Sequence, residues 1–188
     1  MRAPRESGQA SPLYVFVVAS LLFLALAFFA VGQAGATRNG AQSAADAAAL
    51  AAAREQRDSF DLTLDNLGDL LDGELIPVFD GCSASHYYAG QNEANVVGCA
   101  PLDDGRWGST VSVTSQKPVG NTILPGTENL TAEAKATAII VPRCSYDPAE
   151  DVESPSPGSL ECEGDVTELD PQLLPDTSDL FEVRLAED

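Results

Sequence analysis

Leu13 to Val31 has the sequence LYVFVVASLLFLALAFFAV, and this stretch decides the architecture of the chain. No charged side chain occurs between Ser7 and Thr37. At a rise of about 1.5 Å per residue, this length of helix covers roughly 28 Å, which matches the hydrocarbon core of a bilayer. A buried helix of a soluble core would need partner surface on every side, which a chain of 188 residues cannot supply. We therefore predict one transmembrane helix at residues 13–31.

The flank before this helix, residues 1–12, carries Arg2 and Arg5. The positive-inside rule places such a flank in the cytoplasm, so the remainder of the chain is expected on the far side of the membrane. This predicts a single-pass protein of the cell membrane with an extracytoplasmic C-terminal part. An alternative is a cut after Ala36, because Ala34-Gly35-Ala36 has the small-x-small form of a signal-peptidase site and cleavage would release a soluble product.

The anchor is followed by an Ala-rich segment, residues 32–57, which contains GAQSAADAAALAAAREQR. Alanine is the strongest helix former, so the membrane helix is expected to continue outward as a stalk. Gly35, Asn39 and Gly40 are the positions where a kink or break is expected. Small residues on all faces let another helix approach closely, so the stalk is suited to packing against its own head or against neighbours.

Charge separates the two ends of the chain. The formal net charge is −19, and residues 58–188 hold five basic against 26 acidic residues, a balance of 5 − 26 = −21. Binding a phosphate backbone depends on Lys and Arg, and anionic headgroups repel acidic surfaces. Nucleic-acid binding is therefore excluded, and the only membrane contact we expect is the anchor.

Two short segments resemble a known family. Gly8-Gln9-Ala10 precedes the anchor, and AQSAADAAALA follows it at residues 41–51, with Gln42 and Asp46 set in the alanine run. Together they resemble the N-terminal module of TadE/TadG-like proteins of the tight-adherence, or Flp pilus, assembly system, over roughly residues 5–57. The resemblance implies other Tad/Flp components as partners through this helix, homo- or hetero-oligomers, and Gln42 and Asp46 as a helix-packing motif.

One departure from the related pilin pattern concerns processing. Pilin-like precursors are cut after a glycine and carry a glutamate at the fifth position of the mature chain. Cleavage after Gly8 would place Leu13 at that position, and Glu6 lies on the wrong side of the cut. The chain is therefore more similar to TadG-type members that keep an uncut anchor.

The segment from residue 58 to residue 147 is predicted to form a small α+β head on this helix, which is also the general plan of pilin-like subunits. Phe60, Leu64, Leu67 and Leu71 are spaced by 4, 3 and 4, which predicts a helix. Asp58 or Ser59 can cap the start of this helix, and Gly73 can end it.

Alternating or β-branched stretches predict a short antiparallel sheet. Residues 109–115 and 132–141 are expected to pair as a hairpin, because Pro and Gly residues mark a loop between them. The C-terminal segment, residues 179–188, contains LFEVRL and is expected to supply the last strand.

Four cysteines follow the anchor, which fits an oxidising exterior. Three pairings are open in principle, and we predict the sequence neighbours, Cys82 with Cys99 and Cys144 with Cys162. Each would close a loop of about 16–18 residues and stabilise the head by roughly 3 kcal/mol. A zinc site is the alternative, but the chain has no C-x-x-C pair and one histidine.

Residues 148–178 are dense in Asp, Glu, Pro, Ser and Gly. Low hydrophobicity and high charge predict a tethered acidic loop that does not fold by itself. The acidic residues do not follow the EF-hand spacing, so no calcium site is predicted.

The sequence offers no catalytic motif: no P-loop, no H-E-x-x-H, no G-x-S-x-G and no nucleotide-binding glycine pattern occurs in it. We expect a non-enzymatic protein without cofactor or metal. Two hypotheses remain. The first is a pseudopilin-like or minor component of a Flp/Tad pilus assembly machinery. The second is an anchored or released extracytoplasmic binding protein of the cell surface.

Overall fold

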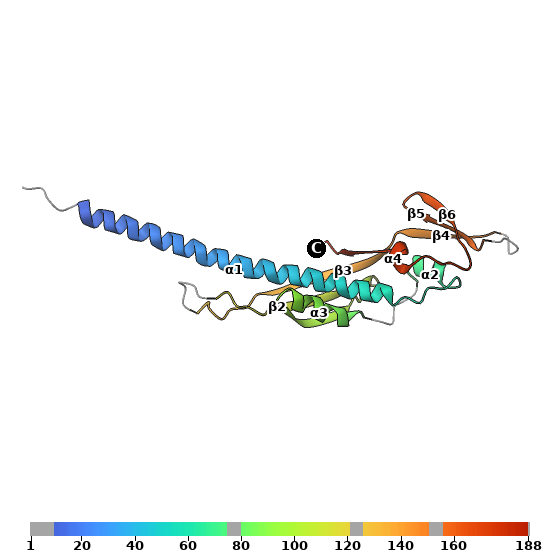
Figure 1. Ribbon diagram of the computed structural model, residues 1–188, viewed down its shortest axis with the longest axis horizontal. Helices are drawn as coiled ribbons and strands as arrows, with labels where there is room; N and C mark the ends of the chain where they lie inside the picture. The colour runs from blue at the N-terminus through green and yellow to red at the C-terminus, as the bar shows by residue number, and fades with distance from the viewer. Residues whose placement is uncertain (1–9, 75–79, 121–125, 151–155, 188) are drawn as a thin grey trace, which may run out of the picture.

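The computed structural model describes residues 10–74, 80–120, 126–150 and 156–187, and its architecture is the predicted α+β plan (Figure 1). One long helix leads into a head that contains two antiparallel sheets, short helices and two disulfides. The helices are α1 (Ala10–Asp58), α2 (Leu67–Leu71), α3 (Cys82–Gln91) and α4 (Thr177–Leu180). The strands are β1 (Ala94–Pro101), β2 (Trp107–Ser115), β3 (Glu133–Pro142), β4 (Cys144–Pro148), β5 (Gly158–Cys162), β6 (Asp165–Glu168) and β7 (Phe181–Leu185).

Helix α1 is continuous over 49 residues, about 73 Å at the standard helical rise. The break considered at Gly35, Asn39 and Gly40 does not occur. A glycine in a helix costs only about 1 kcal/mol relative to alanine, and the alanines that follow favour the helix strongly. The first half of α1 extends away from the head, and its second half lies along the head (Figure 1).

The larger sheet has the strand order β1-β2-β3-β7, all antiparallel. The predicted hairpin is confirmed as β2 and β3, with Val111 opposite Ala136 in the register. The predicted last strand is confirmed as β7, although Leu180 belongs to the one-turn helix α4 that precedes it. Helix α1 packs across this sheet beside α3, so the second half of α1 is in contact with both the sheet and α3.

The predicted helix that starts near residue 58 is wrong in its extent, because only α2, Leu67–Leu71, is helical. Asn66 explains the late start. Its side-chain oxygen accepts from the backbone N–H of Thr63 at 2.8 Å, and its amide donates to the carbonyl of Asp61 at 2.8 Å. These bonds hold a turn that competes with helix over the preceding residues. Phe60 nevertheless packs against the core from this turn.

The prediction of a tethered loop over the acidic residues 148–178 is also wrong. Strands β5 and β6 lie inside it and form a second sheet of order β4-β5-β6. The pair Cys144 and Cys162 stands opposite in the β4–β5 register, so the disulfide closes that ladder. Leu160 is buried, and the hydroxyl of Tyr146 donates to the carbonyl of Pro157 at 2.8 Å. The disulfide, the buried leucine and this hydrogen bond stabilise the segment, although it has few apolar side chains.

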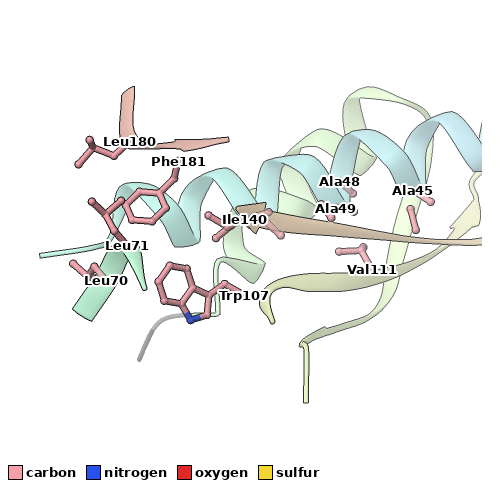
Figure 2. Packing of buried hydrophobic residues seen from close by; sticks show 14 of the residues in the cluster. Ala45, Ala48, Ala49, Leu70, Leu71, Trp107, Val111, Ile140, Leu180 and Phe181 are labelled. Atoms are coloured by element: carbon pink, nitrogen blue, oxygen red, sulfur yellow. The ribbon is translucent and has the colours of Figure 1, made fainter. Parts of the chain in front are cut away.

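The core joins both sheets to the helices. Three aromatic rings meet at one end of it: Phe60 meets Trp107 edge-on at 5.2 Å and Phe181 edge-on at 5.3 Å. Leu70 and Leu71 of α2 lie at the same end, and alanines of α1 face Val111 at the other (Figure 2). The core therefore has large side chains at the end near α2, and at its other end the alanines of α1 let the helix pack closely on the sheet.

Candidate functional site: the N-terminal helix

The first half of α1 exposes large apolar side chains on all sides. Among the exposed ones over residues 13–31, the exposed fraction runs from 47% at Val17 to 75% at Phe28. Burying one such side chain is favourable by about 1.5–3 kcal/mol, so water is a poor solvent for this segment. The helix is long and apolar enough to cross a membrane. It is a candidate membrane anchor, at the place that the sequence predicts.

The second half of α1 is a core element built from alanine. Ala44, Ala45, Ala48, Ala49, Ala52 and Ala53 have no exposed surface. A methyl side chain lets the helix backbone approach the sheet and α3 closely. At Gly81, which precedes α3, even a methyl group would not fit, because a Cβ there would lie 1.9 Å from the carbonyl oxygen of Ala52. The stalk therefore packs against its own head.

Gln42 and Asp46 are brought together on α1. The amide nitrogen of Gln42 donates to Oδ1 of Asp46 at 2.8 Å and lies 3.4 Å from the carbonyl oxygen of Lys135 on β3. With Thr137 and Leu185 they line a hollow of about 230 Å³ at the edge of the head. Within the chain the pair thus ties the helix to the sheet. Its contact with a second helix stays a prediction.

The two positions of predicted processing differ in what the structure describes. Gly8 lies outside the described residues. Ala36 is exposed and lies inside the uninterrupted helix α1. A peptide bond there has to leave its helical conformation before a peptidase can bind it as an extended strand.

The cysteines pair as predicted. Cys82–Cys99 joins the start of α3 to β1, and Cys144–Cys162 joins β4 to β5. The first bond ties α3 to the larger sheet, and the second joins two strands of the smaller sheet. Across the described residues, no group of three or more His, Cys, Asp or Glu side chains is arranged to hold a metal ion.

A groove between α1 and α3 is the feature that sequence reasoning missed. It has a volume of about 720 Å³ and is lined mainly by Ala47, Leu50 and Ala51 of α1 and by Ala84 and Tyr88 of α3. The spacing of small residues on one face of α1 could have indicated a packing surface. The sequence could not predict that α3 lies beside this surface, because the packing of α3 on α1 depends on long-range contacts.

The base of the groove is held by Glu55. Its carboxylate accepts from the hydroxyl of Ser83, and its Oε2 accepts from the backbone N–H of Ala84 at 2.6 Å. Both donors lie in the first turn of α3, where backbone N–H groups lack partners within the helix. A carboxylate of α1 therefore caps α3.

These features define a protein with a candidate membrane anchor that continues without interruption into the core of an α+β head. A family model described as putative Flp pilus-assembly TadE/G-like matches residues 8–55. The match confirms the resemblance predicted from the sequence and covers nearly all of α1, so this segment links the chain to Flp pilus assembly. No curated protein and no solved structure matches the chain.

Proposed function

We propose that the protein is a non-enzymatic, pseudopilin-like component of a Flp/Tad-type pilus assembly machinery. One observation carries the proposal: the TadE/G-like segment, residues 8–55, coincides with a helix that is half exposed apolar surface and half buried core. Such a helix can hold the head at a fixed distance from the membrane while its apolar half meets lipid or other membrane helices.

The proposed orientation has residues 1–12 in the cytoplasm and the head, with its two disulfides, outside. Arg2 and Arg5 support this orientation through the positive-inside rule. The disulfides support it independently, because such bonds persist in oxidising compartments.

We propose further that the anchor stays uncut. Leu13 stands where a fibre-forming pilin would present a glutamate after cleavage at Gly8, and Ala36 lies within a continuous helix. The N-terminal residue of the mature protein tests this point. Met1 or Arg2 is expected, whereas Gln9 or Thr37 would contradict it.

Deletion of the gene, followed by a count of surface fibres in the electron microscope, tests the assembly role. Loss of fibres is expected, with recovery when the intact gene is returned. Leu22→Arg puts a charge at the centre of the apolar stretch, which costs about 2.5–3.5 kcal/mol in a membrane helix. This variant should fail to restore fibres, whereas Leu22→Phe should restore them. Fibre numbers in the deletion strain equal to those of the parent would refute the role.

A further inference from the structure

One face of α1 is open along most of its length in the described part of the chain, and near its C-terminal end it borders α3. Its residues recur at spacings of 3 and 4 and lie within an arc of about 80° at roughly 100° per residue. They are Gly32, Ala36, Gly40, Ser43, Ala47, Leu50, Arg54 and Asp58, and all are exposed or half-exposed. A Cβ added at Gly32 or Gly40 would meet no atom within 4 Å. The face is therefore narrow, open and uncharged as far as Arg54.

The upper part of this face is the floor of the α1–α3 groove. Ala47 and Leu50 are half-buried there, and Tyr88 of α3 forms the wall with 47% of its surface exposed. Tyr87 packs edge-on against Tyr88 at 5.3 Å and is 64% exposed. A small apolar floor beside exposed aromatic rings has the composition of a helix-docking groove rather than of a solvated surface.

The charges at the top of the face identify what can enter the groove. Arg54 and Arg57 balance Glu55 and Asp58, so this patch is neutral on a chain of net charge −19. Glu55 is engaged in capping α3. Arg57 binds Oδ1 of Asp58 through two nitrogens, at 2.9 and 2.7 Å, which leaves Oδ2 open. Arg54 makes no ion pair with any described residue.

The anchor restricts how two copies can meet. Ala47 lies 16 residues beyond Val31, about 24 Å along the helix, so the groove stands outside the bilayer. The apolar half of a neighbour in the same membrane cannot reach it. Two anchored copies stand parallel and at equal height, so a two-fold axis normal to the membrane brings the same face of each copy together.

We propose that this face of α1 and the α1–α3 groove form a parallel homodimer interface. Each α1 lies in the groove of the other copy, small residues allow the backbones to approach, and Arg54 of one copy pairs with Asp58 of the second. Arg54 and Asp58 are four residues apart on α1, and a separation of this size lets charges on two neighbouring parallel helices form ion pairs. Elsewhere the strong negative charge of the heads keeps the copies apart. The inference rests on the anchoring part of the proposed function.

Cysteine cross-linking of the full chain in membranes of the producing cell tests the interface. All four native cysteines are in disulfides, so an added cysteine is the free thiol. Ala47→Cys is expected to give, on mild oxidation, a disulfide-linked species of twice the 19.6 kDa chain mass. Val166→Cys, on β6 and 67% exposed, is the matched control and should remain a monomer. Equal cross-linking of the two variants, monomer alone, or an adduct of Ala47→Cys with a different protein would overturn the homodimer.

Charge reversal gives a second readout that a loss of folding cannot imitate. In the Ala47→Cys background, Arg54→Glu or Asp58→Arg alone should lower the cross-linked fraction by about tenfold, because like charges then face each other. The two changes together should restore it. Failure of the double variant to recover, with intact native disulfides, would overturn the pairing. Fibre counts in the deletion strain are independent, so the dimer can fail while the assembly role stands, or the reverse.

Discussion

Replacing Gly81 by alanine should strongly destabilise the head. Gly81 has φ +67, in the left-handed region that costs an L-residue about 1–2 kcal/mol. The new Cβ would lie 1.9 Å from the carbonyl oxygen of Ala52 and 3.0 Å from the backbone nitrogen of Gln56. Both atoms belong to the backbone of α1, so α3 has to move away from its seat, which costs about 1–3 kcal/mol more. The expected loss of unfolding free energy is about 2–5 kcal/mol.

Urea unfolding of the full chain in detergent, followed by tryptophan fluorescence, measures this loss, because Trp107 lies in the core. Gly90→Ala, within α3, is the matched control. A Cβ added at Gly90 would meet no atom within 4 Å, so this change should leave stability equal or raise it by up to about 1 kcal/mol. If the unfolding free energies of Gly81→Ala and Gly90→Ala differ by less than about 0.5 kcal/mol, the close α1–α3 contact does not determine the stability of the head.

The remaining predictions concern the second disulfide and one surface carboxylate. Cys144→Ala with Cys162→Ala should lower the unfolding free energy by about 3 kcal/mol, because the bond closes an 18-residue separation; an unchanged urea midpoint would contradict this. The hydrogen bond from the Arg106 side chain lowers the pKa of Asp104, so the pair stabilises the fold above the ordinary aspartate range and this contribution is lost as pH falls through the lowered pKa. Carboxyl NMR titration should show the pKa rising toward its usual value in Arg106→Gln, and an unmoved titration would exclude the pair as the cause.

The features predicted correctly share a local cause. The apolar half of α1, the candidate anchor, is a continuous apolar run, the β2–β3 hairpin has alternation on both sides of a Pro- and Gly-rich loop, and the disulfides join sequence neighbours. In each case, the information lies in one continuous stretch of no more than about 35 residues. Helix α1 adds the alanine propensity that carries the helix through Gly35 and Gly40.

The features that were missed have no hydrophobic pattern that identifies them in the sequence. Strand β6 is exposed at every position, so no alternation marks it, and β5 has Leu160 as its deeply buried large side chain. The β4–β5 ladder holds because the Cys144–Cys162 bond joins opposite positions. The apolar spacing from Phe60 to Leu71 identified core residues correctly but not the helix, because Asn66 forms a local turn that competes with it.

The alanine run of α1 meets two demands that large side chains could not meet together. On one face, Ala44, Ala48 and Ala52 let the backbone settle against the sheet and α3, where Leu or Phe would hold them apart. On the adjoining face, Ala36 and Ala47 leave the helix slim enough for a second helix to approach. Because α1 is unbroken from its apolar half to the head, the head and the candidate anchor keep one relative orientation. A contact made at the groove is therefore transmitted to the membrane segment as a fixed orientation, which a flexible tether would lose.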